Sequence, residues 1–579
     1  LRHRLNAGWI VLALTLAACA APTTTAPTAP ASSQAGTTSQ PPGPPKRIVI
    51  AMQGEPFTMS GQVNTAAGSS TVRGVDELEQ LVHAGMATAD KAGGLTPQLA
   101  EAVPSVENGL WKVLPDGRME TTWKIRSNAR WQDGTPVTSR DFALAVTLGR
   151  DTDLVSFRSR VYDTIQAVET PDPQTVLVRW SKPYIKADAL FALGADRLAA
   201  PVPSHLLEAP YTTDKATFME LPYWSTSFVG AGPFKLRTWV RDNYLQLEAF
   251  DGFVGGRPKL DEIEVRFIPD QNALVANILS GTVELTLGRS VSINQAVQVR
   301  DQWHDGHVEM APDSWASVFP QFINPTPAII GNVQFRRAML QAIDRQEMVD
   351  TIEDGLSSVA DSWMQPNQQA YQEIERQQVV RYAYDPRRAA DAIEQLGYHK
   401  GPDGTYQDAT GQKLSVELRA SQTDLNQRVM LAVTSFWQKL GVDASSYLIP
   451  RQLASDDEFR ASYPGFEVTR RSNDLRGLGN LYSSQAPQAS NHFTGGNNGR
   501  YQSPELDALL DNYFVTIAPR DRTTVLGQIL HHLSDQVVVL GLFYDPQPVL
   551  IGNRLRNVNA KPTPDATQAW NANEWDVAS

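Results

Sequence analysis

Cysteine is almost absent from this chain, which carries only Cys19 among its 579 residues. A single cysteine leaves no intramolecular disulfide, so we expect the fold to be stabilised by the packing of a buried core. The hydrophobic content of 41% is ordinary for a globular protein with such a core. The apolar stretch at residues 9–18 has about half of the roughly 20 residues that a membrane-spanning helix needs. It is therefore not expected to remain as a membrane segment.

Positively charged residues are fewer than negatively charged ones. The chain has 51 Lys and Arg residues and 63 Asp and Glu residues, which gives a net charge of −12. This balance argues against a nucleic-acid partner, because phosphate binding depends on clustered Lys and Arg. The Gly-x-Ser-x-Gly, His-Glu-x-x-His and phosphate-loop motifs are missing as well. His531 and His532 would point about 100° apart on a helix, so they do not form a chelating pair and are expected to be ordinary surface or interface histidines. The sequence therefore predicts no enzymatic activity, no cofactor and no metal.

The first 18 residues have the layout of a secretory signal, with a basic beginning, the apolar stretch and two small residues before Cys19. The quartet Leu-Ala-Ala-Cys at residues 16–19 resembles a bacterial lipobox. That resemblance implies cleavage before Cys19 and a diacylglycerol on its thiol. Two acyl chains hold a protein stably at a membrane surface. The alternative is a buried and unreactive cysteine, which is the common fate of a lone one.

Residues 19–45 are predicted to be the lipidated cysteine and a tether. Residues 20–45 consist of Ala, Pro, Thr, Ser, Gln and Gly and have no apolar period. Such a segment buries too little apolar surface to offset the entropy of ordering it. We therefore expect the folded part to begin near residue 46 and to lie close to a membrane.

Strand patterns occur at several places in the rest of the chain. Apolar and polar residues alternate at 245–249, at 263–267 and at 414–418, as they do in strands with one buried face. Helix patterns lie between them and no sequence repeat is found. This mixture predicts an α/β fold.

Helix signals are clearest in the second half of the chain. Asp385 is placed to cap a helix that Gly397 ends, and Ser503 with Pro504 begins another. An apolar period over residues 335–352 predicts one further helix. Each of these helices has one apolar face, so we expect them to pack against the strands.

Several ordered stretches resemble the landmarks of family 5 of the extracellular solute-binding proteins. These proteins are the oligopeptide, dipeptide and nickel receptors of ABC importers. The first stretches are GGLTPQLAEAVPS and TTWKIRSNARWQDGTPVTSRDFALAVTLGRD, in which Trp123 and Trp131 are expected to be core residues. The others follow in the order typical of the family, at residues 201–208, 230–285, 335–349, 384–398 and 503–510.

The resemblance implies an α/β fold with two lobes, of the large type II periplasmic-binding-protein form with an extra subdomain in the first lobe. The lobes close around a solute, and this closure is an equilibrium that the ligand biases. By analogy the chain divides as follows: signal peptide 1–18; lipidated cysteine and tether 19–45; lobe 1, 46–70 with 210–305 and 530–579; extra subdomain 71–209; lobe 2, 306–529.

The resemblance also implies where the ligand binds. In the peptide receptors a carboxylate of the second lobe captures the ligand's amino terminus, and Asp474 is the candidate here; the alternative is a turn or helix-cap carboxylate. Arg470 and Arg471 would favour a carboxylate or phosphate on the ligand, or else form a solvated face. Trp315 and Trp363 lie in segments that line the cleft in the family, with core packing as the alternative.

The sequence thus predicts a lipid-anchored, monomeric substrate-binding protein that delivers a small solute, an oligopeptide or dipeptide, to an ABC permease and its ATPase subunits. It would lie at the outer face of the cytoplasmic membrane, attached by its lipid. Two alternatives remain at this point. One is a secreted hydrolase of peptides or glycans, and the other is a sensory solute receptor with the same fold.

Overall fold

The computed structural model describes residues 44–66, 72–157, 160–194, 199–374 and 378–578. The predicted signal peptide, Cys19 and the tether up to residue 43 lie outside these residues. Residues Pro45–Ser579 form one compact unit. Among the described residues, no helix is both long enough and apolar enough to cross a bilayer.

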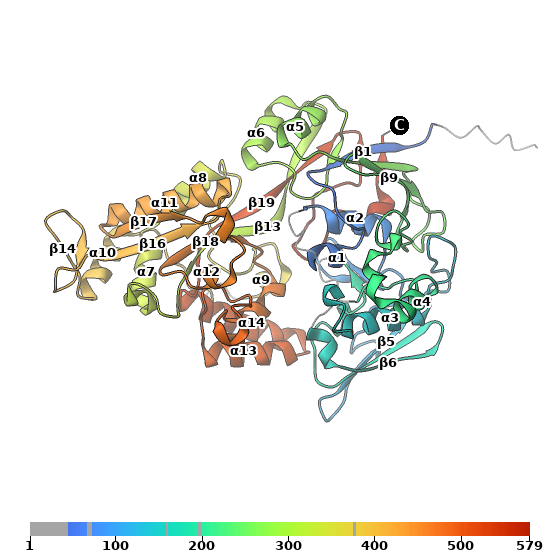
Figure 1. The fold of residues 1–579 in the computed structure, drawn as a ribbon, viewed down its shortest axis with the longest axis horizontal. Coiled ribbons are helices and arrows are strands. Elements are labelled where there is room, and N and C mark those ends of the chain that lie inside the picture. The colour runs from blue at the N-terminus through green and yellow to red at the C-terminus, as the bar shows by residue number, and fades with distance from the viewer. Residues whose placement is uncertain (1–43, 67–71, 158–159, 195–198, 375–377, 579) are drawn as a thin grey trace, which may run out of the picture. The chain divides into compact units, whose positions relative to one another are not determined.

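A ten-stranded mixed sheet is the central element of the fold (Figure 1). Its middle is formed by two long strands, β13 (Gly306–Pro320) and β19 (Leu540–Gly552). Next to β13 lie, in order, β18 (Phe466–Arg471), β16 (Ser415–Ala420) and β17 (Asp443–Leu448). Next to β19 lie, in order, β12 (Leu285–Thr286), β1 (Arg47–Met52), β11 (Glu262–Phe267), β10 (Tyr244–Ala249) and β9 (Phe234–Val240). The three predicted strands are confirmed as β10, β11 and, to within two residues, β16.

The pairing of β13 with β19 is interrupted between Ala311 and Ser314. Pro312 falls in this interruption and Pro546 lies opposite it. A proline cannot donate a hydrogen bond to the ladder, so the sequence itself places an irregularity here. On one side of the interruption β13 pairs with β18, and on the other side β19 pairs with β12. The two long strands therefore connect the two halves of the sheet, and the predicted two-lobe α/β fold is confirmed.

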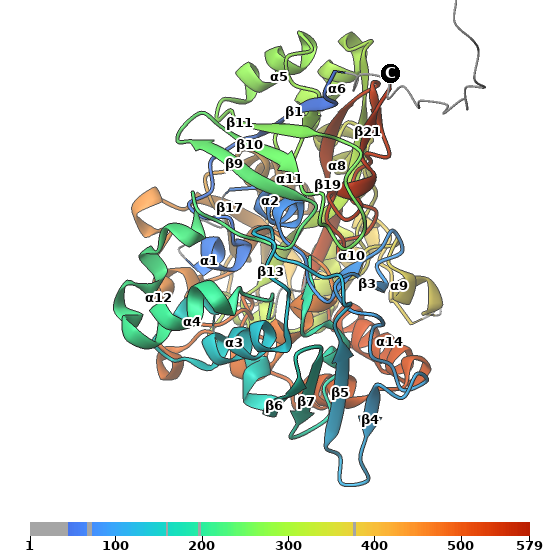
Figure 2. The same ribbon diagram turned by 90° about the vertical axis from the view of Figure 1, so that its right-hand side faces the viewer.

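In the half that we call lobe 1, short helices accompany β1 and its neighbours (Figure 2). They are α1 (Gly61–Ala66), α2 (Val75–Val82), α5 (Gln271–Leu279) and α6 (Ile293–Gln302). A four-stranded sheet is built from β4 (Trp111–Val113), β5 (Met119–Lys124), β7 (Thr175–Trp180) and β6 (Ile165–Asp172). Further elements are β3 (Leu95–Pro97), β2 (Ala87–Ala89), β8 (Ala192–Leu193), α3 (Ser139–Arg150), α4 (Ser204–Thr213), β20 (Leu555–Arg556) and β21 (Asp576–Val577).

The stretch around Trp131 has a structural role. Asp141 accepts a hydrogen bond from the Trp131 indole at 3.1 Å and others from Thr138 and Ser204, so it links a turn to the starts of α3 and α4. Thr138 and Asp141 form the capping box of α3. Trp123 and Trp131 are fully buried, which confirms that they belong to the core.

In the half that we call lobe 2, helices pack against β16, β17 and β18. They are α7 (Val333–Gln341), α8 (Arg345–Ile352), α10 (Pro386–Gln395) and α11 (Asp424–Leu440). A neighbouring core involves α9 (Gln369–Glu373), α13 (Pro504–Val515) and α14 (Pro519–Asp535). The remaining short elements are α12 (Asp457–Ala461), β14 (His399–Lys400) and β15 (Tyr406–Gln407).

The predicted helix caps of this half are confirmed, but one predicted helix is wrong. Asp385 and Ser503 each accept a backbone hydrogen bond at the start of α10 and α13. The single helix expected over 335–352 is two helices instead. Asp344 accepts a hydrogen bond from the backbone of Glu347 and so begins α8 as a new helix. An apolar period cannot reveal this break, because both helices bury one face against the same core.

Candidate ligand-binding site

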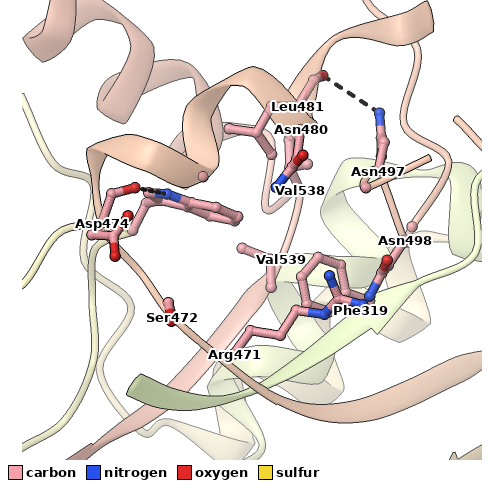
Figure 3. Close-up of a pocket in the computed structure, with 14 residues that line it drawn as sticks. Phe319, Arg471, Ser472, Asp474, Asn480, Leu481, Asn497, Asn498, Val538 and Val539 are labelled. Atoms are coloured by element: carbon pink, nitrogen blue, oxygen red, sulfur yellow. Dashed lines mark hydrogen bonds between the residues drawn. The ribbon is translucent and has the colours of Figure 1, made fainter. Parts of the chain in front are cut away.

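A cavity of about 440 Å³ lies where β18 ends (Figure 3). One wall is formed by Arg471 at the end of β18 and by the segment that follows it, through Asp474 into the 3₁₀ helix Leu475–Leu481. The opposite wall is the turn at residues 496–499, and Phe319 and Val538 close the space between them. The cavity therefore combines polar groups with an apolar floor, as ligand sites commonly do.

Asp474 and Trp363, two predicted ligand-binding residues, lie together at this cavity. The Trp363 indole donates a hydrogen bond to the backbone carbonyl of Asp474 at 3.1 Å. Asp474 is only 2% exposed and has a further interaction within the protein. Gly477 lies against the indole, where an added Cβ would come within 3.2 Å of the ring. The tryptophan thus fixes the position of the aspartate.

Trp315 lies in the core and is not among the residues that line this cavity. Its side chain is 2% exposed and meets Trp363 edge to face, with ring centroids 5.7 Å apart. Gly541 makes room for it, since a Cβ there would lie 2.6 Å from the Trp315 ring. Of the two predicted aromatic residues, the structure brings only Trp363 to the cavity of Asp474.

Arg470 and Arg471 are adjacent in β18, and successive residues of a strand point to opposite faces. The Arg470 guanidinium forms ion pairs with Asp313 and Asp545. The Arg471 side chain lines the cavity instead, as Figure 3 shows. The structure therefore separates the two predicted arginines, and it places only Arg471 where a ligand could reach it.

The carboxylates that hold Arg470 belong to a buried charge cluster at the interruption of β13 and β19. Arg289 contacts Asp545 at 3.1 Å, and Lys561 contacts Asp313 at 3.5 Å. Burial alone would raise the pKa of Asp313, but the charges of Lys561, Arg470 and Arg289 hold it well below its usual value. This cluster was not predicted, because its members lie far apart in the sequence.

Metal binding finds no support in the part of the chain that the structure describes, where no cluster of three or more His, Cys, Asp or Glu side chains could hold an ion. His531 is exposed, as expected. His532 is buried, because α14 turns it toward Tyr501, whose hydroxyl lies 3.0 Å from its Nε2.

The polar turn at residues 495–499 is the part of the cavity that sequence reasoning missed. Its composition, Gly-Gly-Asn-Asn-Gly, indicates a turn but not what lies beside it. Asn497 uses its side chain to hold the turn, accepting from the backbone of Tyr501 and donating to the carbonyls of Tyr482 and Tyr501. The neighbouring Asn498 side chain is thereby presented to the cavity.

The fold and this cavity between polar segments define a solute-binding protein. Residues 94–464 match the family described as "Bacterial extracellular solute-binding proteins, family 5 Middle", and the chain belongs to this family. Its members are transporter receptors, so the chain is a binding protein and not an enzyme.

Similar proteins come from several bacteria. The chain is 25% identical over 426 residues to a Brucella ovis protein whose name describes an ABC transporter peptide-binding protein, covering 71% of this chain and 73% of that one. It is 21% identical over 546 residues to the oligopeptide-binding protein AppA of Bacillus subtilis, covering 92% and 91%. The structure of that AppA in complex with a nonapeptide has the same fold, with a TM-score of 0.68 over 93% of this chain and all of that one, at 19% identity.

Proposed function

We propose that this protein is the substrate receptor of an ABC importer and that it binds an oligopeptide or dipeptide in the cavity beside Asp474. The observation that carries the proposal is the buried aspartate positioned by Trp363 at the end of β18. A carboxylate in a partly apolar cavity suits the amino terminus of a peptide, because the pair is shielded from water there. The names of the Brucella and Bacillus relatives support a peptide as cargo.

No covalent step is needed for this function. Binding would stabilise a closed arrangement of the two lobes, since a ligand that contacts both shifts the equilibrium toward closure. The strands β13 and β19 run from one half of the sheet to the other. The chain would therefore bend in these two strands when the lobes close. The closed form would then deliver its cargo to a permease powered by separate ATPase subunits.

Native mass spectrometry of the purified protein tests the cargo directly, because a bound peptide appears as added mass. Thermal unfolding with a panel of short peptides is the second test, since a ligand that binds only the folded state raises Tm. Stabilisation by peptides without any cleavage product is expected. If no peptide stabilises the protein and none copurifies, the peptide assignment is wrong.

Loss of labelled-peptide uptake on deletion of the protein would separate a transport receptor from a sensor.

We also propose that the mature protein is a monomer held by a diacylated Cys19 at the outer face of the cytoplasmic membrane. The support is the order of basic, apolar and small residues before Cys19 and the tether-like composition behind it. Cys19→Ser should move the protein from the membrane fraction to the soluble fraction. Unchanged membrane retention of this variant would disprove the anchor.

A further inference from the structure

A loop of lobe 2, residues 363–368, contacts the segment that carries the candidate ligand carboxylate. At the start of the loop the Trp363 indole donates to the Asp474 carbonyl, as described above. Two residues further on, the Gln365 side-chain amide donates to the side-chain oxygen of Asn473 at 3.0 Å. Gln365 and Asn473 are both buried. The first half of the 363–368 loop therefore holds two successive residues of the ligand-site segment.

The other end of the 363–368 loop contacts lobe 1. The Asn367 side-chain amide donates to the Pro562 carbonyl at 3.0 Å, and the Gln368 side-chain amide donates to the Asp565 carboxylate at 3.4 Å. Both acceptors belong to lobe 1, since the chain from residue 555 to its end packs into the lobe 1 core. None of these four residues is among the described residues that line the ligand cavity. The loop thus joins the two lobes at a place outside that cavity.

Hydrogen bonds within the 363–368 loop connect its two ends. The Gln365 backbone N–H donates to the Gln368 side-chain oxygen at 3.2 Å, and the Gln368 N–H donates to the Gln365 carbonyl at 3.1 Å. Because the amide oxygen of Gln368 accepts this bond, its NH₂ group is the one turned toward lobe 1. Between the two ends, the Met364 carbonyl accepts a hydrogen bond from the Tyr544 hydroxyl of β19 at 2.9 Å. A continuous set of hydrogen bonds therefore runs from the ligand-site segment, past a long strand that joins the lobes, to lobe 1.

The lobes are not closely packed beside the lobe 1 end of this loop. A second cavity, of about 330 Å³, lies there between them. Its lining includes Gln368 and Ala370 from lobe 2 and Gly93, Thr563 and Asp565 from lobe 1. A single hydrogen bond contributes little net free energy, because water replaces it when the partners separate. The contacts of the loop with lobe 1 can therefore form and break as the lobes move.

We propose that the 363–368 loop couples ligand binding to closure of the lobes, with Gln365 and Gln368 as positioning residues. The inference rests on the proposed receptor function and adds to it the residues that link the ligand to the lobe movement. A ligand bound at Asp474 fixes the segment that Gln365 contacts, and this favours the loop arrangement in which Gln368 reaches Asp565. Closure in turn strengthens ligand binding, because a coupling between two sites is reciprocal.

An exchange of partners at pH 8 tests the lobe 1 end of the loop. Gln368→Glu keeps the oxygen that accepts from the Gln365 backbone but brings a second carboxylate up to Asp565, and two carboxylates so close repel each other. The double variant Gln368→Glu with Asp565→Asn restores one amide and one carboxylate with their places exchanged. Gln346→Glu is the matched control, since Gln346 donates to Asp350 at 2.9 Å within lobe 2 alone.

Two measurements are needed, one for the lobes and one for the ligand. Small-angle X-ray scattering gives the radius of gyration, which increases when the lobes separate, and titration calorimetry gives the affinity for tetra-alanine. Gln368→Glu should increase the radius of gyration and weaken tetra-alanine binding about 10-fold, because less of the protein is in the closed arrangement. The double variant should restore both quantities. Gln346→Glu should match the wild type in both.

Unchanged values in Gln368→Glu, or a double variant that restores neither, would overturn the proposal. A larger radius with unchanged affinity would also overturn it, because the loop would then join the lobes without coupling them to the ligand. If tetra-alanine binds to none of the proteins, the peptide function loses this support, and the radius of gyration still decides on the loop. An increase in Gln368→Glu that the double variant reverses supports the proposal, and no increase refutes it.

Asn367→Ala is a second variant at an exposed position, where the fold is least disturbed. It removes the hydrogen bond to the Pro562 carbonyl and should weaken tetra-alanine binding about 2- to 5-fold, with an increase in the radius of gyration. Wild-type values of both would count against the role of the loop. Far-ultraviolet circular dichroism and Tm verify that each variant is folded.

Discussion

Arg470 on β18 reaches across β13 to form an ion pair with Asp545 on β19. Asp545 is 1% exposed, and Arg289 contacts it from lobe 1. One carboxylate on a long strand is therefore contacted by arginines from both halves of the sheet. Since both β13 and β19 cross between these halves, the charge cluster lies at the place where the lobes are joined.

Removal of Arg470 should destabilise the protein. Arg470→Met leaves Asp545 and Asp313 buried with one fewer cation, and breaking a buried pair in this way costs about 3 kcal/mol. Urea unfolding followed by tryptophan fluorescence measures the loss. The double variant Arg470→Met with Asp545→Leu should recover part of it, because the unpaired charge is gone. A loss in Arg470→Met no larger than that in the exposed Arg451→Gln would contradict the role of the cluster.

Glu353 should make stability fall as the pH rises. Burial and the charge of Asp545 raise its pKa from 4.5 to about 8, although Arg289 opposes this shift. Between these two values the folded state holds a proton that the unfolded state has released, so the stability is full below about pH 4.5 and decreases up to about pH 8.

Glu353→Gln keeps this position neutral at every pH. The variant should therefore match the wild type near pH 5 and exceed it near pH 8.5, by roughly 2 °C or more in Tm. Differential scanning calorimetry at both pH values measures the difference. Glu347→Gln, an exposed change in α8, the helix that ends directly before Glu353, controls for the loss of one carboxylate. A constant difference in Tm at the two pH values would show that Glu353 does not titrate in this range.

Asp474 should discriminate between free and blocked amino termini. Asp474→Asn removes the negative charge with little change in shape, so a peptide with a free amine should lose about 10- to 100-fold in affinity. The same peptide with an acetylated amine should lose much less. Titration calorimetry with both peptides separates these outcomes. Equal losses would mean that Asp474 only supports the turn that it begins.

Trp363 should matter for ligand affinity through its indole nitrogen. Trp363→Phe removes the hydrogen bond to the Asp474 carbonyl but keeps an aromatic ring, at a cost of about 1 kcal/mol in stability. Trp437 is a matched control, because its indole donates to the Met339 carbonyl at 3.0 Å in a different core. Both variants should lose similar stability, whereas only Trp363→Phe should weaken peptide binding. Equal affinities of the two variants would exclude a positioning role for Trp363.

Local rules in the sequence predicted much of the secondary structure. The alternation at 245–249 and 263–267 gave strands because one face of each is buried, and Asp385 and Ser503 capped helices because their side chains satisfy backbone donors. The helix expected over 335–352 failed for a related reason. Asp344 is a cap in the middle of an apolar period, and the period continues across the break between α7 and α8.

The sequence by itself determined the family and the α/β fold, since these depend on local patterns and on their order along the chain. The resemblance to the family then implied the segment from Arg470 to Asp474 as the candidate site. Only the tertiary structure decided what each residue of that segment does. Arg470 and Arg471 are chemically identical neighbours, yet one meets Asp313 and Asp545 while the other faces a cavity. The difference arises because strand geometry turns them to opposite faces and because the groups they meet lie far away in the sequence.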